Sequence, residues 1–212
     1  DNTRETLSDE PGEDAQKTSA FSAKFSYQGF KSFGLTALVS HADTDLTYGY
    51  DEDWAYAGIS DPSVNPDIDP DFAYWEYTST DYYFREKSVQ TIELRAISNK
   101  GSEIFNNTTS WVAGVYFKQD EEDLLRKYTY ASSDFISTAD NTNIAVYGQL
   151  DTQFSDKLTL ATGIRVEQRD SKYNNSNNYA DSPSDTMVGG KIVLSYQQNN
   201  DRQINKNPRK IT

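Results

Sequence analysis

Residues 144–166 read IAVYGQLDTQFSDKLTLATGIRV, and this stretch decides the fold class. Apolar side chains stand at every second position from Ile144 to Leu150, apart from one glycine, and again at most alternate positions from Leu158 to Val166. Alternation with a period of two is typical of β-strands with one apolar and one polar face. Only a short polar segment, 155–157, separates the two runs. The stretch therefore predicts an antiparallel hairpin with a tight turn.

The same period recurs elsewhere in the chain, and no segment of helical period of useful length competes with it. The other alternating segments are 21–27, 33–39, 86–98, 111–117 and 188–196. Together with the hairpin they predict an all-β protein of about seven strands, joined as an up-and-down antiparallel meander.

Composition divides the chain into three parts. Residues 1–18 are acidic and almost without apolar side chains, so we expect a flexible arm or loop. Residues 19–197 hold the alternating strands, and residues 198–212 form a polar tail. Within the middle part, irregular loops are predicted where prolines, acids or asparagines cluster. These loops are 49–84, 119–140 and 171–185.

Charge and composition exclude several functions. The 212 residues include no cysteine, one histidine, 20 Lys+Arg and 33 Asp+Glu, for a net charge of -13. Thiol chemistry and metal sites built from His or Cys are therefore excluded, and the acidic balance argues against a nucleic-acid partner. The acidic run 67–71 lacks the glycine of a calcium-binding loop. We predict no enzyme activity, no cofactor and no metal site.

Period-two strands fit either a membrane β-barrel or a soluble β-sandwich. The predicted connections alternate between short and long, and aromatic residues lie next to the short ones, as in outer-membrane barrels. Charges on the face opposite the apolar one suit a hydrated lumen. The predicted lumen-facing residues are Glu93, Arg95, Asp151, Arg165 and Glu167, and the predicted lipid-facing residues are Ile144, Val146, Leu158, Leu160 and Ile164. A soluble, secreted sandwich that binds carbohydrate stays open as the alternative.

The segment 43–84 is the candidate ligand-binding region. It holds 11 acids and many aromatic residues but no Lys or Arg. Aromatic rings stack on sugars or flat ligands, and carboxylates accept hydrogen bonds from hydroxyl groups. A plainer interpretation is a solvated loop whose aromatic rings pack on one another. The candidate residues are Tyr50, Asp51, Trp54, Tyr56, Tyr74, Trp75 and Tyr77.

Five motifs in order resemble the barrel portion of the TonB-dependent receptors. They are TIELRAIS at 91–98, WVAGVYF at 111–117, YGQ at 147–149, LTLATGIR at 158–165 and GGKI at 189–192. The resemblance covers about residues 20–198 and implies a segment, without a plug domain, of a barrel of about 22 strands in the bacterial outer membrane. It also implies import of a scarce ligand: a siderophore, haem, cobalamin or an oligosaccharide. The implied partners are membrane lipid, the small ligand and, through a plug, an inner-membrane energy-coupling complex.

Overall fold

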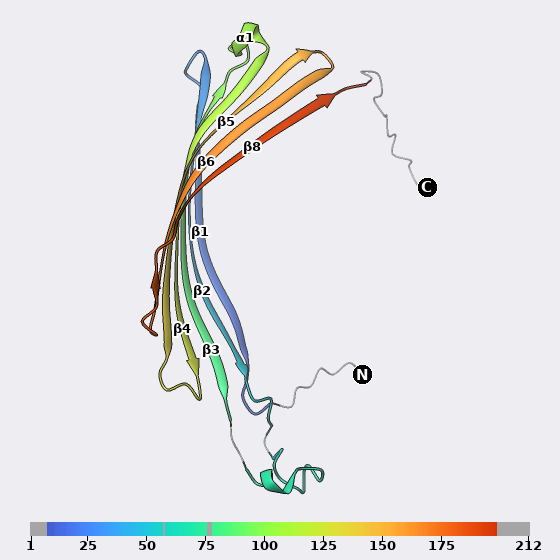
Figure 1. Ribbon diagram of the computed structural model, residues 1–212, viewed down its shortest axis with the longest axis vertical. Helices are drawn as coiled ribbons and strands as arrows, with labels where there is room; N and C mark the ends of the chain where they lie inside the picture. The colour runs from blue at the N-terminus through green and yellow to red at the C-terminus, as the bar shows by residue number, and fades with distance from the viewer. Residues whose placement is uncertain (1–7, 57, 76–77, 199–212) are drawn as a thin grey trace, which may run out of the picture.

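The computed structural model describes residues 8–56, 58–75 and 78–198, which form one curved antiparallel sheet (Figure 1). The strands are β1 (Glu13–Tyr27), β2 (Phe33–Asp51), β3 (Thr80–Ser98), β4 (Thr109–Tyr128), β5 (Phe135–Ser155), β6 (Leu158–Asn175), β7 (Ala180–Asp181) and β8 (Ser184–Tyr196). Two short helical segments, η1 (Pro70–Phe72) and α1 (Ile104–Asn107), lie in connections. Neither of these described helices is long and apolar enough to cross a membrane.

The topology is the predicted meander. Each of β1 to β6 pairs with its neighbour in sequence, and both β7 and β8 pair with β6. The all-β antiparallel fold is confirmed, with the two-residue β7 as an additional strand before the last one. The hairpin of β5 and β6 closes through residues 156–157, as the alternation predicts.

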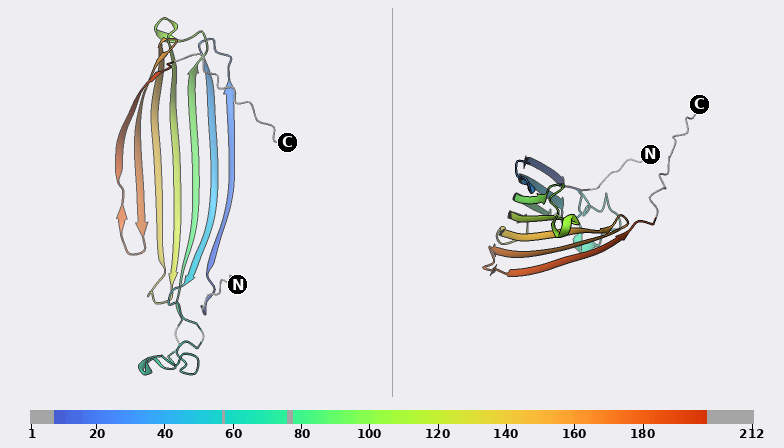
Figure 2. Two further views of the ribbon diagram at one scale, coloured as in Figure 1. Left: turned by 90° about the vertical axis from the view of Figure 1, so that its right-hand side faces the viewer. Right: turned by 90° about the horizontal axis from the view of Figure 1, so that it is seen from above.

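The sheet is a single layer without an apolar core. Both views in Figure 2 show one curved surface, with β1 and β8 at opposite edges. Among the described residues, Ala55 and Ala145 are the buried hydrophobic side chains. One layer of strands cannot cover its own apolar face, so the large aliphatic side chains of the described residues remain partly or largely exposed.

An apolar band crosses the sheet on one face. Cross-strand pairing aligns one residue from each of five successive strands, and all five are aliphatic and more than a third exposed. They are Leu94, Val115, Val146, Val166 and Val188. Further apolar rows flank this one on both sides: toward the short turns and, on β1 to β5, away from them, where the aligned residues are Ala23, Val39, Ile92, Phe117 and Ile144. We call these rows together the apolar band.

The strands extend well beyond the apolar band. β4 continues to Tyr128 and β5 begins at Phe135, so the prediction of irregular structure over 119–140 is wrong. β1 begins at Glu13 and pairs with β2 from there, so part of the predicted arm lies in the sheet. In these outer parts both faces are mostly polar, apart from short apolar rows such as Phe84, Leu125 and Ile136. Backbone pairing persists there without the apolar alternation that reveals a strand in the sequence.

The connections lie at two opposite ends of the sheet. One end holds residues 28–32, 99–108 and 156–157, and the other holds 52–79, 129–134 and 176–179. Figure 1 shows α1 at the first end and the segment containing η1 at the second. The alternation of short and long connections predicted from the sequence therefore depends on one long loop, 52–79, because the other two on its side are short.

Candidate ligand-binding site

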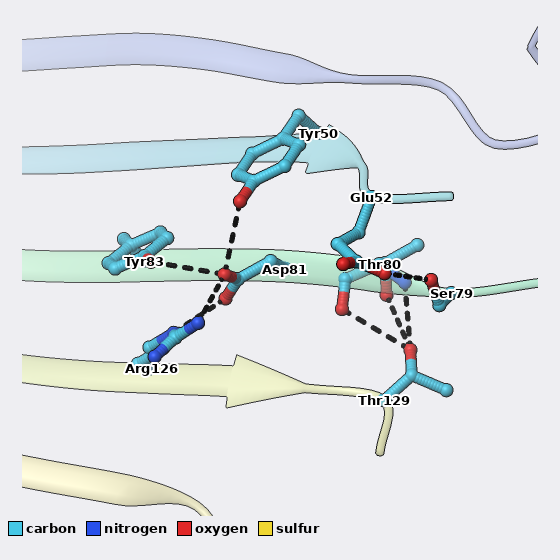
Figure 3. A network of polar contacts seen from close by, with 8 residues as sticks. All are labelled: Tyr50, Glu52, Ser79, Thr80, Asp81, Tyr83, Arg126 and Thr129. Atoms are coloured by element: carbon cyan, nitrogen blue, oxygen red, sulfur yellow. Dashed lines mark hydrogen bonds and ion pairs between the residues drawn. The ribbon is translucent and has the colours of Figure 1, made fainter. Parts of the chain in front are cut away.

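Polar side chains gather on the concave face of the sheet, opposite the apolar band. Figure 3 is seen from this concave side. Its strands follow one another from β1 at the top downward, in the same order as from right to left in the left view of Figure 2, which faces the concave side. Asp81, Tyr83 and Arg126 lie on this side in Figure 3. Alternation along β3 then places Glu93 and Arg95 on the same face as Asp81.

The strongest polar contacts lie near the 52–79 loop. Arg126 donates two hydrogen bonds to the carboxylate of Asp81, from Nε to Oδ1 at 2.8 Å and from Nη2 to Oδ2 at 2.6 Å. The hydroxyl groups of Tyr83 and Tyr50 also donate to Asp81 Oδ2, at 3.0 and 3.3 Å (Figure 3). Asp81 is 1% exposed. We call Tyr50, Asp81, Tyr83 and Arg126 the loop-end cluster.

The loop-end cluster has a defined charge state. The hydrogen bonds from Arg126 hold the pKa of Asp81 below its ordinary value, against the opposing effect of burial. Burial and the nearby Asp81 carboxylate raise the pKa of Tyr83. These groups lie at the end of β3 remote from the apolar band. At neutral pH the cluster therefore combines an ionised carboxylate, a guanidinium and two neutral phenols.

Arg126 also lies against two aromatic rings. Its Cζ atom is 5.2 Å from the centre of the Tyr83 ring and 5.6 Å from that of Tyr128. Such stacking holds the planar guanidinium in place while leaving part of it accessible. Beside the cluster is an open hollow of about 560 Å³, to which Tyr48, Tyr50 and Arg85 contribute. Aromatic surface and fixed hydrogen-bonding groups therefore meet at an open site.

A second polar cluster occupies the middle of the concave face. Arg95 pairs with Glu93 at 2.8 Å, and Arg165 pairs with Glu167 at 2.7 Å. Tyr147 contacts both ion pairs: its hydroxyl donates to Glu93 Oε1 at 2.5 Å, and its ring centre lies 5.9 Å from Arg165 Cζ. We call these five residues the mid-sheet cluster. Four of the five predicted lumen residues thus lie together, whereas the fifth, Asp151, accepts hydrogen bonds from Gln149.

A glycine allows the Tyr147 contact. The Tyr147 ring starts on β5, passes over Gly114 on β4 and reaches Glu93 on β3. A Cβ atom at Gly114 would lie 2.5 Å from Tyr147 Cζ, which is too close for unbonded carbon atoms. The glycine of the WVAGVYF motif is therefore required by the ring that lies over it.

The predicted ligand-binding residues do not form one site. Tyr50 belongs to the loop-end cluster, and Asp51 is buried at the end of β2. Trp54 and Tyr74 are more than 70% exposed and have positive φ angles, and Tyr56 is partly exposed in the same loop. Trp75 stacks on Phe72 with ring centres 5.8 Å apart. Tyr77 lies outside the described residues.

All five residues predicted to face lipid share the face of the apolar band. Alternation and pairing put Ile144 and Val146 of β5 on the same face as Leu160 and Ile164 of β6, and Leu158 follows by alternation. Ile144, Val146 and Ile164 are each more than half exposed in this single sheet. This face therefore offers apolar surface over its whole width next to the short turns.

Of the loop-end cluster, only Tyr50 is among the residues named as ligand-binding candidates from the sequence. Asp81 and Tyr83 lie within the candidate region 43–84 but are not named there, and Arg126 lies outside it, in the segment 119–140 that the sequence predicts to be irregular. No local signal marks the strand face of Arg126, because polar residues stand at every position from Lys118 to Asp123 and Leu124 interrupts the concave row before Arg126.

Solved structures with the same architecture were found by comparison. The ferric yersiniabactin uptake receptor FyuA from Yersinia pestis has a TM-score of 0.60 and 14% identity over 88% of this chain and 26% of that chain. The copper transporter OprC has a TM-score of 0.59 and 16% identity, over 85% and 27%. The ferric citrate transporter FecA has a TM-score of 0.55 and 14% identity, over 87% and 25%.

The sheet has the fold of a segment of a TonB-dependent receptor barrel. This chain spans about a quarter of the length of those three proteins. They are a receptor and two transporters rather than enzymes. No protein-family model and no curated protein matches the sequence.

Proposed function

We propose that this chain forms part of the barrel wall of a TonB-dependent receptor in the bacterial outer membrane. The exposed apolar band supports this proposal more than any other observation. It crosses the sheet on the face opposite the polar clusters, and the described residues offer no second layer to cover it. Hydrocarbon chains would cover the band without requiring a protein partner.

In this proposal the two faces meet different solvents. The convex face contacts lipid through the apolar band, including the five residues predicted from the sequence. The concave face lines the lumen, where the mid-sheet cluster pairs its charges and remains hydrated. The aromatic residues beside the short turns then lie at one membrane interface, where Tyr27, Phe30 and Phe33 are in ring contact.

The receptor would capture a small ligand at the end bearing the 52–79 loop. The loop-end cluster and its hollow supply aromatic faces, hydroxyl groups and a partly exposed guanidinium. The exposed Trp54 and Tyr74 rings of the loop extend this surface. Siderophores, haem, cobalamin and oligosaccharides remain the ligand classes expected, and transport would need the plug and the inner-membrane energy-coupling complex of a whole receptor.

Single-cysteine scanning tests the proposed arrangement, because the chain has no cysteine of its own. Spin labels at successive positions of β5, 144 to 149, would be studied in lipid vesicles. Labels at Ile144 and Val146 should be accessible to oxygen dissolved in the bilayer. Labels at Tyr147 and Gln149 should be accessible to a water-soluble nickel complex. A label at Asp43, which lies on the convex face beyond the band, serves as the aqueous control.

The opposite results would reject the proposal. If labels at Ile144 and Val146 were shielded from both relaxing agents, another protein layer would cover the band. That outcome would favour the alternative, a soluble β-sandwich that binds carbohydrate. A sandwich requires a second sheet, whereas the described residues form one.

A further inference from the structure

Three carboxylates from two distant parts of the sequence meet at the base of the 52–79 loop. Asp9 precedes β1, Asp51 ends β2, and Asp53 begins the loop. One oxygen of each lies within 4.8 Å of the corresponding oxygens of the other two. In the described part of the chain, none of the three forms an ion pair with Lys or Arg. Among the described residues, nothing therefore balances the charges of this group.

Asp51 supplies a second, independent observation. Its side chain is 8% exposed, and Ser8 Oγ donates to its Oδ2 at 2.7 Å. Its other oxygen, Oδ1, is buried, and no donor among the described residues reaches it. A buried carboxylate oxygen without a partner is costly, because it loses water without gaining a hydrogen bond. A cation bound between the three carboxylates would provide the missing partner.

The other oxygens of the cluster are held in place. Asp53 Oδ1 accepts a hydrogen bond from the backbone N–H of Ala55 at 2.7 Å, and Asp53 Oδ2 accepts one from the N–H of Ser79. Each oxygen keeps a lone pair that can bind a cation. The backbone N–H of Asp9 donates to the Ala55 carbonyl at 3.1 Å, which brings the N-terminal segment to the same point. These contacts orient the carboxylates in the way that hydrogen bonds orient metal ligands elsewhere.

We propose that Asp9, Asp51 and Asp53 form a calcium-binding site. Two oxygens that bind one Ca²⁺ at about 2.4 Å can be at most about 4.8 Å apart, and the three carboxylate oxygens lie within that limit. The ligands are all oxygen atoms, the type that Ca²⁺ prefers, and an irregular loop base suits its flexible geometry better than the strict octahedron of Mg²⁺. The ion would fix the loop base to the segment that precedes β1.

Calcium titration of the chain in detergent micelles, after treatment with a chelator, tests this site. Isothermal titration calorimetry should show saturable binding of one Ca²⁺. Asp51→Asn keeps the side-chain shape and removes the charge, so its Ca²⁺ affinity should fall at least tenfold. Asp67→Asn removes an exposed carboxylate of the same loop outside the cluster, and its affinity should stay within twofold of the wild type.

Two further measurements separate loss of the site from misfolding of the Asp51→Asn variant. Asp9 is exposed, so Asp9→Asn should fold normally and still weaken Ca²⁺ binding. Ca²⁺ should also slow proteolysis of the 52–79 loop in the wild type but not in Asp51→Asn. The absence of saturable binding would overturn the proposal, as would equal weakening in Asp67→Asn. Because no import ligand is used, these results are independent of the proposed transport function.

Discussion

The two halves of the long strands differ on their convex side. Next to the short turns this side carries aliphatic residues such as Val115 and Val146. Next to the 52–79 loop the same side carries mostly polar or charged residues, such as Glu86 opposite Asp123, with one apolar row at Phe84, Leu125 and Ile136. The concave side carries a charged cluster in each half. One continuous strand can therefore present two kinds of convex surface, and in the proposed barrel the mainly apolar length is the part that contacts lipid.

The largest expected effect comes from placing a charge in the apolar half of a strand. Val146→Arg places a charge in the apolar band and should destabilise the protein in lipid vesicles by about 2–4 kcal/mol, as for arginine at the middle of a bilayer. Thr138→Arg places the same charge on the same strand and face but beyond the band, and should cost less than about 1 kcal/mol. Guanidinium unfolding in vesicles measures both. Equal losses would mean that the band is not in contact with lipid.

A smaller effect is expected at the loop-end cluster. Arg126→Leu leaves the buried Asp81 carboxylate without its main partner and should cost about 2 kcal/mol, less than for a fully buried pair because Arg126 is 39% exposed. Arg85→Leu is the matched control, since both members of the Arg85–Glu122 pair are partly exposed, and it should cost less than about 1 kcal/mol. Similar losses of unfolding free energy in both variants would show that burial of Asp81 does not strengthen its ion pair with Arg126.

Two glycines on the concave face provide a finer test. Gly114→Ala forces the Tyr147 ring away and weakens its hydrogen bond to Glu93, so it should cost about 1 kcal/mol. Gly189→Ala is expected to be close to neutral, because nothing lies within 4 Å of the added Cβ. Measuring the free energy of unfolding of the two variants distinguishes these expectations. A neutral Gly114→Ala would show that the position of the ring is not fixed.

The smallest expected effect depends on pH. The pKa of Asp81 is lower in the folded protein than its ordinary value near 3.9, so the stability gained from its ionised form is present above about pH 4. That contribution is lost as the pH falls through the folded-state pKa. The stability difference between the wild type and Asp81→Asn should therefore narrow on acidification. A difference that stayed constant from pH 7 to pH 2 would contradict the assigned ion pair.

The sequence predicts the strands well where one face is apolar. The alternation at 144–166 identifies β5, β6 and the turn between them, because the contrast between faces is visible in the residues. It fails over 119–128, where Asp120 and Glu121 point to opposite faces and both are polar. A period of two has no signature when both faces meet water.

The functional clusters could be predicted only in part. The mid-sheet residues Glu93 and Arg165 follow from alternation alone, since their face is determined by their apolar neighbours. Pairing of Asp81 with Arg126 needs the register between β3 and β4, which no local pattern supplies. The meeting of Asp9 with Asp51 has the same origin, because it depends on how the chain enters β1.

The apolar band also slants across the sheet. On β1 it extends to Phe21, but the residues that stand in the same row on the following strands, from His41 to Ser184, are polar. On β8 the band ends at Val188, two rows closer to the short turns. Two rows are about 13 Å along the strands, and six strand spacings are about 29 Å across them, which corresponds to a lean of about 25°. If the band lies parallel to the plane of a flat bilayer, the strands must therefore tilt away from the membrane normal by about the same angle.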